Sequence, residues 1–386
     1  MNYTMTLLIK NKKKVLNLKS LDALRGLLAL YVLCGHARWL LWAGHSEWKQ
    51  YIHPLWSNII AYSSGCFRYG HEAVIIFFVL SGFFIHLRVS KQLAEKNGFQ
   101  LDIVYFFKRR FHRLIPPYVF ALLLTLIVDL IGRALYPTLY HAATGDVLLD
   151  NNFVNKGFSW TSIIPALFLL PSSLGKDFGT NGPFWSLSYE FVYYLLYPLW
   201  LTIRRFGTWH GYLTGISLAL ASIWFLPSSF IRSILIHYPI WLSGAIIAEM
   251  VVRKRLPKWT ILISCFCSSI AFIAINLNLS ESFKLLFYTL LGSSILLIVI
   301  SLPIIIFRHP LHRFLEFLGI ESYTIYICHF PLVAFVSAWT IETFGARPMN
   351  GWLAIGTVAI TLLLCHLFFL LCERHFMHSR LKIESS

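Results

Sequence analysis

The segment LDALRGLLALYVLCGH carries three ionisable side chains, Asp22, Arg25 and His36, inside an otherwise apolar run. Such groups are costly to bury in an apolar helix and therefore indicate function. Arg25 and His36 are eleven residues apart, about 20° past three helical turns and about 16 Å along the axis, so they share one face. An imidazole placed this way can act as a general base. The structural alternatives are a snorkelling Arg25 paired with Asp22, and an interfacial His36.

A carboxylate lies in a second apolar run, NGPFWSLSYEFVYYLLYP. Glu190 follows Pro183 by seven residues, or about 10 Å of helix, and we expect it at a depth comparable to that of His36. A carboxylate and an imidazole at one level can form a hydrogen-bonded pair that keeps the imidazole basic and oriented. A purely structural bond between helices is the alternative. The aromatic residues around Glu190 are also typical of an interfacial belt.

Two arginines are spaced for an anionic ligand. FFKRRFHRLIPPY, which we expect to be a cytoplasmic loop ahead of an apolar run, places Arg110 and Arg113 three residues apart beside Lys108 and Arg109. Guanidinium groups at this spacing suit a phosphate or pyrophosphate, although basic residues that contact lipid headgroups would look the same. His329, in SYTIYICHFPL, lies near the middle of another apolar run and is either a polar brace or a residue that lines a site.

The composition indicates a membrane protein. Of 386 residues, 57% are hydrophobic and 13% are charged, about half the charged fraction of a soluble domain. The net charge of +16 does not point to nucleic acid, because the basic residues cluster between apolar runs. We expect a single all-α domain over residues 1–386 that contacts membrane lipid and no nucleic acid.

Ten runs are long and apolar enough to cross a bilayer. They cover residues 21–43, 71–89, 114–136, 183–204, 210–226, 230–251, 259–277, 283–306, 320–344 and 350–372. The apolar segment 160–171 is too short to cross and is expected in the outer interface. The prediction is a polytopic bundle of about ten transmembrane helices.

The basic residues predict the orientation of this bundle. Successive spans cross the membrane in opposite directions, so every second connecting segment lies on the same side. The segments on one of the two sides are all basic, as the positive-inside rule requires of the cytoplasmic side. Both termini are therefore expected in the cytoplasm, with residues 1–20 and 373–386 as the terminal segments. Residues 1–20 lack the core and cleavage site of a signal peptide. Their lysines are expected to form an anchor: Lys10, Lys12, Lys13, Lys14 and Lys19. The polar stretch 137–182 becomes an extracytoplasmic loop, a candidate lid or substrate-facing segment.

Other chemistry has little support. The sequence has no glycine-rich phosphate loop, no GxSxG elbow and no HExxH helix. Its seven cysteines lie almost entirely in apolar runs, where a thiol behaves as a small hydrophobe, so no disulfide framework is expected. His375 and His378 are expected in a solvated tail rather than in a metal site, and we predict no metal.

Five motifs follow one another along the chain: LDALRGLLALYVLCGH, GHEAVIIFFVLSGFFI, RRFHRLIPPY, FWSLSYE and SYTIYICHFPL. In this order, over about residues 18 to 375, they resemble the acyltransferase-3 family of membrane O-acyltransferases, for which ten spans is the usual count. The resemblance implies transfer of an acyl group, commonly acetyl from acetyl-CoA, to a surface polysaccharide, lipopolysaccharide or related glycan. It also implies a location in the bacterial cytoplasmic (inner) membrane. Many members carry a fused SGNH-type hydrolase domain. This sequence shows none, so we expect direct transfer.

The resemblance also assigns roles. The Arg–His motif of the family falls on Arg25 and His36, its Arg-x-x-Arg on Arg110 and Arg113, and its acidic residue on Glu190. We expect His36 to act as the base, Glu190 to orient it, and the three arginines to bind the phosphates of acyl-CoA. A covalent acyl-histidine is an alternative to direct transfer. The expected substrate-binding residues are Arg68, Trp185, Ser186, Tyr189 and His329, and Ser186, Ser188 or Tyr189 could stabilise an oxyanion.

Two other classes of protein compete with this hypothesis. A secondary transporter of a small anionic or glycan-related solute would also place ionisable residues near the midplane, but it predicts inverted repeats and broken spans, and no repeat is evident. A lipid-binding scaffold predicts no dependence on CoA. A homo-oligomer is compatible with every one of these hypotheses.

Overall fold

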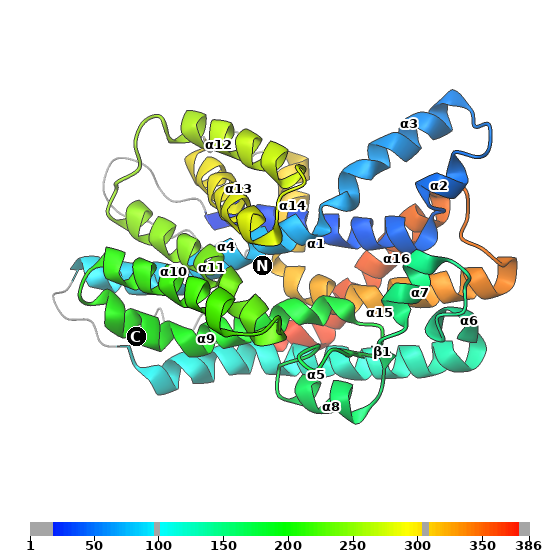
Figure 1. The fold of residues 1–386 in the computed structure, drawn as a ribbon, viewed down its shortest axis with the longest axis horizontal. Coiled ribbons are helices and arrows are strands. Elements are labelled where there is room, and N and C mark those ends of the chain that lie inside the picture. The colour runs from blue at the N-terminus through cyan, green and yellow to red at the C-terminus, as the bar shows by residue number, and fades with distance from the viewer. Residues whose placement is uncertain (1–17, 96–100, 303–308, 378–386) are drawn as a thin grey trace. The chain divides into compact units, whose positions relative to one another are not determined.

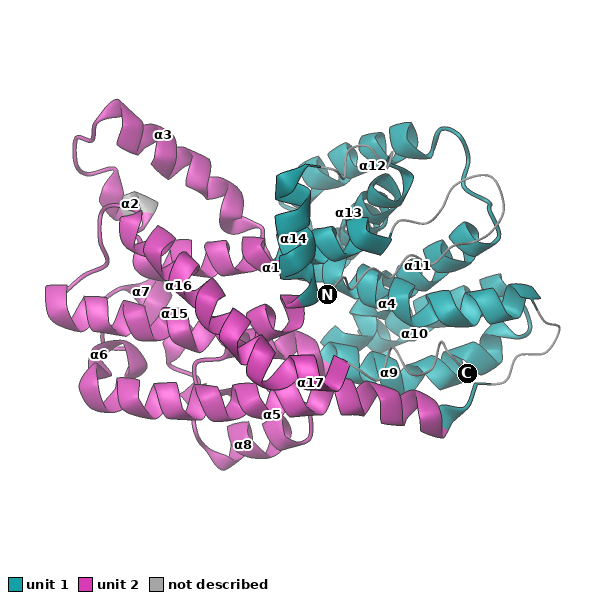
Figure 2. Ribbon diagram, turned by 180° about the vertical axis from the view of Figure 1, so that it is seen from behind, with its two compact units in different colours: residues 1–28, 71–103, 189–320 teal, residues 29–70, 104–188, 321–386 magenta. Residues whose placement is uncertain are grey.

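The computed structural model describes residues 18–95, 101–302 and 309–377 (Figure 1). The expected anchor residues Lys10 to Lys14 and the tail from residue 378 onward lie outside this part of the chain. The described chain forms two compact units, coloured in Figure 2. Among the described residues, unit 1 covers 18–28, 71–103 without 96–100, and 189–320 without 303–308, and unit 2 covers 29–70, 104–188 and 321–377. Each unit is assembled from three separate stretches of sequence, and each is described by itself.

Unit 1 is a bundle of helices. It contains the first part of α1 (Leu18–Leu41), followed by α4 (Gly70–Glu95) from its second residue, α9 (Trp185–Arg204) from residue 189 onward, α10 (Thr208–Phe225), α11 (Phe230–Val252), α12 (Thr260–Ile275), α13 (Glu281–Ser301) and α14 (Pro310–Ile320). Residues 185–188 at the start of α9 belong to unit 2.

Unit 2 combines long helices with a set of short elements. It contains the rest of α1, then α2 (His45–Trp48), α3 (Leu55–Ser64), η1 (Gly65–Arg68), α5 (Ile103–Leu135), α6 (Pro137–Tyr140), α7 (Val147–Phe153), β1 (Lys156–Gly157), α8 (Trp160–Leu167), β2 (Asp177–Phe178), η2 (Gly182–Phe184), α15 (Ser322–Phe344), α16 (Trp352–Phe368), the π-helical turn η4 (Phe369–Glu373) and α17 (Arg374–Met377).

Helices lie at all ten runs predicted to cross the membrane. Within the described ranges, six helical segments are long and apolar enough to do so: α4, α5, α11, residues 282–301 of α13, α15, and residues 352–377 from α16 to α17. The protein is therefore an all-α, multi-pass membrane protein. The count of ten spans and the orientation of the termini stay predictions. Residues 303–306, at the end of the predicted span 283–306, lie outside the described residues.

The structure differs from the sequence prediction at the start of α5. We expected FFKRRFHRLIPPY to be a loop before a span at 114–136, yet this segment is helical from Ile103. Pro116 and Pro117 lie inside the helix. Each proline removes one backbone N–H donor but keeps a helical φ, and membrane helices tolerate this loss where neighbours satisfy the carbonyls.

Close packing between α4 and α11 depends on two glycines. A Cβ added to Gly82 would lie 1.9 Å from the carbonyl oxygen of Trp241, and one added to Gly244 would lie 1.9 Å from that of Val79. Larger side chains would therefore force the two backbones apart. Small residues at a helix interface are typical of membrane proteins, in which association relies on close van der Waals contact.

A buried ionic cluster also joins the helices of unit 1. Glu249 of α11 accepts hydrogen bonds from Arg204 of α9 (2.6 and 2.7 Å), from His86 of α4 (3.0 Å) and from Thr208 (3.0 Å). His86 is completely buried, and its second ring nitrogen lies 2.9 Å from the Tyr197 hydroxyl. We call these five residues the ionic cluster.

The segment between α5 and α9, expected to be one long loop, contains several short elements and is tied to the long helices. The Asp129 carboxylate of α5 accepts hydrogen bonds from the backbone N–H and the hydroxyl of Thr180 (2.5 and 2.8 Å). The Asn181 side chain donates to Thr125 of α5 (3.0 Å) and to the Ile327 carbonyl of α15 (2.8 Å). These buried bonds fix the chain just before α9 begins.

Candidate active site

Two histidines meet inside unit 2. His36 of α1 and His329 of α15 approach through His36 Nδ1 and His329 Nε2, which are 2.8 Å apart. Their rings are nearly parallel, with centroids 5.1 Å apart. His329 is completely buried and His36 is half-buried. Both residues stand out in the sequence, and the fold brings them together although 293 positions separate them.

The partners of the two rings fix which nitrogen carries each proton. His329 Nδ1 lies 2.9 Å from the backbone carbonyl of Ile325, which can only accept, so this nitrogen is the N–H donor. In a neutral His329, Nε2 is then an acceptor, and the proton of the shared bond belongs to His36 Nδ1. His36 Nε2 is left with a lone pair. We call this arrangement the histidine relay.

Glu190 lies in unit 1, where it is held by two hydroxyl groups. One of its carboxylate oxygens accepts from Ser81 Oγ of α4 (2.8 Å) and from the Tyr194 hydroxyl one turn along α9. Ser81 Oγ in turn accepts from Trp241 Nε1 (3.2 Å). Glu190 is half-buried in this unit, whereas His36 is described in unit 2, so the expected pair between them stays a prediction.

The three arginines expected at the phosphates divide between the units. Arg25, in unit 1, lies 3.6 Å from Asp22 and 6.0 Å from the Phe84 ring. Arg110 and Arg113 are half-buried on the first turns of α5 in unit 2, and the Arg110 guanidinium is 5.7 Å from the Phe106 ring. A spacing of three residues on a continuous helix places Arg110 and Arg113 on one face.

The other expected substrate-binding residues have partners within the protein. Arg68 is exposed and donates to the Tyr69 hydroxyl (2.5 Å). Ser186 is buried, and its hydroxyl lies 2.7 Å from that of Tyr326 and 3.2 Å from the Pro183 carbonyl. Trp185 is half-buried at the start of α9.

Tyr189 and Ser188 are also buried and hydrogen-bonded. Tyr189 donates to Ser233 Oγ (2.6 Å) and stacks on Phe78, with ring centroids 5.6 Å apart. Ser188 donates to the Pro171 carbonyl (2.9 Å). Both hydroxyl protons therefore have acceptors inside the protein, and the expected role of these groups as oxyanion donors stays a prediction.

An ion pair close to the histidine relay is not evident from the sequence. Lys156 of β1 donates to Asp177 of β2 (2.8 Å), and only 5% of the Lys156 side chain is exposed. Both residues lie in the segment that the sequence predicted as a loop. A lysine and an aspartate 21 positions apart carry no local signal of pairing, and the parallel register of β1 and β2 is what brings them together.

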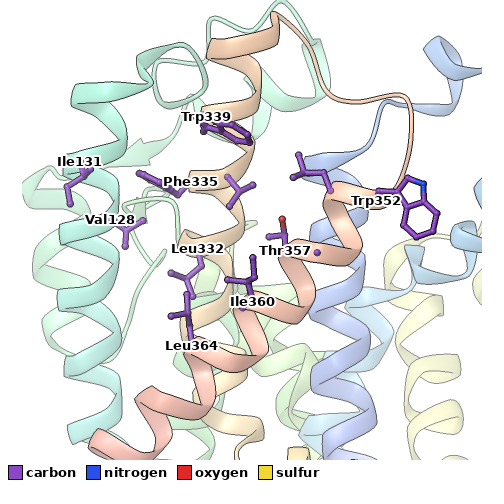
Figure 3. A pocket seen from close by; sticks show the side chains of 13 residues that line it. Val128, Ile131, Leu332, Phe335, Trp339, Trp352, Thr357, Ile360 and Leu364 are labelled. Carbon is purple, nitrogen blue, oxygen red and sulfur yellow. The ribbon is translucent and has the colours of Figure 1, made fainter.

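A separate apolar cavity of about 540 Å³ opens between α5, α15 and α16 in unit 2 (Figure 3). Leu332, Phe335 and Trp339 of α15 form one wall, and the polar side chains in its lining are those of Thr357 and Thr361. Its lining contains no ionisable side chain and therefore offers no base and no charge for a phosphate.

Comparisons with known proteins show the family of the chain. The model of a family described as an acyltransferase domain, the acyltransferase-3 family, matches residues 18–370. The chain is 27% identical over 339 residues to the peptidoglycan O-acetyltransferase OatA of Listeria monocytogenes. The aligned region covers 79% of this chain and 51% of OatA. It is also 29% identical over 170 residues to the acyltransferase MdmB of Streptomyces mycarofaciens. The aligned region covers 42% of this chain and 37% of MdmB.

The chain therefore spans about half the length, or less, of these curated relatives. No solved structure gives a significant match. Because the family model covers all five motifs singled out in the sequence, the chain belongs to the acyltransferase-3 family.

Proposed function

We propose that this protein is a membrane O-acyltransferase that moves an acyl group, acetyl in the first instance, from acyl-CoA to a hydroxyl group of a surface glycan or glycolipid. The observation that carries the proposal is the histidine relay, which leaves His36 Nε2 with a lone pair at the end of a buried hydrogen-bonded chain. Membership of the family and the likeness to a peptidoglycan O-acetyltransferase support the type of reaction and the class of acceptor.

His36 is the general base of this reaction. Its Nε2 takes the proton of the acceptor hydroxyl as the hydroxyl oxygen attacks the thioester carbonyl carbon. The C–S bond then breaks, and the imidazolium returns the proton to the departing thiolate, so His36 ends each cycle neutral. The hydrogen bond to His329 holds His36 in the tautomer in which Nε2 of His36, rather than its Nδ1, carries the lone pair. Glu190 helps to orient or stabilise the imidazole in the assembled site.

The donor approaches from the cytoplasm and the acceptor from the other side of the membrane. Arg110 and Arg113 bind the phosphates of CoA together with Arg25, because guanidinium groups form strong charge-assisted bonds with phosphate oxygens. The segment 137–182 faces the acceptor. This orientation has both termini in the cytoplasm, with the protein in the bacterial inner membrane.

Membrane vesicles provide the test of the proposed function. Vesicles from cells that lack the gene, with and without the restored protein, are given acetyl-CoA labelled in the acetyl group. Thiol release is followed, and the glycans are analysed by mass spectrometry. We expect label to enter a glycan ester only when the protein is present. A secondary transporter would consume no acetyl-CoA, so the absence of both signals would overturn the proposal.

The donor site is tested by binding to the purified protein. Loss of two charge-assisted contacts in Arg110→Ala/Arg113→Ala should weaken CoA affinity by about 3 kcal/mol, or about 150-fold. Lys108→Ala is the matched control, because Lys108 is exposed on the same turn of α5. Unchanged affinity of the double variant by calorimetry would move the phosphate site elsewhere.

A further inference from the structure

Lys156 is a buried cation in the segment between α5 and α9. It stands opposite Asp177 in the two-residue parallel ladder of β1 and β2, and its ammonium donates to Asp177 Oδ2 at 2.8 Å. Its side chain is 5% exposed. A buried charge is costly to desolvate and persists only when it is well paired. The ladder is therefore built to hold an ammonium at this point.

The ammonium of Lys156 faces the surroundings of the histidine relay. Its Nζ is 5.3 Å from the centre of the Phe330 ring, and Phe330 packs edge-on against His36 with centroids 4.9 Å apart. Lys156 is near enough to His36 to interact with it electrostatically. On another side, a Cβ added to Gly182 would lie 2.7 Å from Nζ, so the glycine leaves room for the ammonium just before α9.

The Lys156 ammonium has more N–H groups than the one that is bonded to Asp177. An ammonium has three N–H donors. Among the described residues its one hydrogen bond is to Asp177. A buried, fixed donor with spare N–H groups is suited to a ligand oxygen that carries negative charge.

The proposed reaction creates such an oxygen beside His36. When the acceptor hydroxyl attacks the thioester, negative charge moves to the acyl carbonyl oxygen, and preorganised donors stabilise it in a site without bulk water. We propose that Lys156 donates a hydrogen bond to this oxygen and is a catalytic residue of the acyltransferase. No proton is transferred in this contact, because the ammonium keeps its three hydrogens throughout the cycle. The inference rests on the proposed function and adds a residue to it.

A structural alternative makes a different prediction. If the pair of Lys156 and Asp177 only clasps β1 to β2, removing either partner should be equally harmful. If Lys156 acts on the substrate, the ammonium matters more than the carboxylate. The variants Lys156→Met and Asp177→Asn therefore separate the two roles. Lys176→Met is the matched control, because Lys176 is exposed and adjoins Asp177.

The test measures acetyl-CoA turnover in membrane vesicles, with thermal unfolding of each variant as a check on folding. We expect Lys156→Met to lower kcat by about 10²–10³, the effect of losing one oxyanion donor, with little change in the KM for acetyl-CoA. Lys156→Arg should recover part of this loss, and Lys176→Met should match the wild type. Asp177→Asn keeps an oxygen that can accept the Lys156 hydrogen bond but loses the charge, so it should lower stability and yet retain more activity per folded molecule than Lys156→Met. If Lys156→Met does not accumulate, Lys156→Gln takes its place, because an amide can still donate to Asp177 but has no charge.

Two results would overturn the inference. One is equal loss in the Lys156 and Asp177 variants, with recovery in the exchanged pair Lys156→Asp/Asp177→Lys, because that pattern belongs to a clasp. The other is wild-type turnover in Lys156→Met while His36→Gln is inactive. A wild-type protein that consumes no acetyl-CoA would instead overturn the proposed function itself.

Discussion

The ionic cluster of unit 1 and the histidine relay of unit 2 are both buried polar groups, yet they differ in what is left unbonded. In the ionic cluster, both oxygens of Glu249 accept hydrogen bonds, and both ring nitrogens of His86 have partners. In the relay, His36 Nδ1 is bonded, and no hydrogen bond of its Nε2 is found among the described residues. A saturated cluster can brace helices but cannot accept a further proton without breaking a bond. An unsaturated one can accept a proton.

This difference predicts opposite responses to mutation. Removing one partner of a buried ion pair leaves an uncompensated charge and destabilises the fold. Removing a group that has an acceptor atom without a hydrogen bond, such as His36 Nε2, should leave the fold near normal and abolish the chemistry. Stability and turnover therefore have to be measured on the same variants.

The largest effect is expected at His36. His36→Gln keeps a polar side chain but removes the base, so kcat should fall by about 10²–10⁴. The melting temperature and CoA affinity should stay close to those of the wild type. His141→Gln is the matched control, because His141 is exposed in the same unit. Normal glycan acylation in the His36 variant would make His36 a structural residue, with His329 the next candidate for the base.

The ionic cluster should show the reverse. Glu249→Gln removes the charge that compensates Arg204, and we expect a loss of about 3–5 kcal/mol of stability. Turnover per folded molecule should change little. Thermal unfolding in detergent, with activity normalised to the folded fraction, measures both. If the variant melts normally but is inactive, the cluster takes part in the chemistry and the contrast between the two regions fails.

The contrast also shows what the sequence could and could not predict. The positions of the helices follow from long apolar runs, and helices are found at all ten of them. His36, Glu190 and His329 stood out because they are ionisable residues in apolar runs with recognisable motifs. Their roles stay predictions.

The same rule applied to Asp129, His86 and Glu249, which also lie inside apolar helices, but the sequence analysis did not single them out. An isolated ionisable residue in a span signals that a partner exists without saying which one. The partners of Glu249 in this cluster come from α4, α9 and the start of α10, between 41 and 163 positions away. Only the fold shows that this cluster is saturated and that the relay is not.

A smaller effect is expected at His329, which is bonded to His36 Nδ1 and so supports the proposed base. His329→Leu removes the acceptor for His36 Nδ1, so the two tautomers of His36 become comparable and the imidazole loses its fixed orientation. Losing the supporting partner of a metal-bound histidine typically costs about 10–100-fold, and by analogy we expect a loss of this size in kcat. His329→Gln should recover part of the rate, because its amide oxygen can accept the same bond. Equal rates for the two variants would mean that His329 acts through packing alone.

The smallest effects come from two tyrosines on α9 that test the contrast within one helix. Tyr194 donates to Glu190, and Tyr197 bonds to His86 of the ionic cluster. Each change to Phe deletes one hydroxyl and keeps the ring, so each should remove about 1 kcal/mol of interaction. If Glu190 serves the reaction, Tyr194→Phe should lower kcat/KM about fivefold at nearly constant melting temperature, because Ser81 still holds the carboxylate. Tyr197→Phe should lower the melting temperature and leave kcat/KM unchanged.

Because the two positions are three residues apart on one helix, each variant is a control for the other. If both variants lose stability and keep their activity, Glu190 is a structural carboxylate like Glu249, and the base must be oriented by His329 without it.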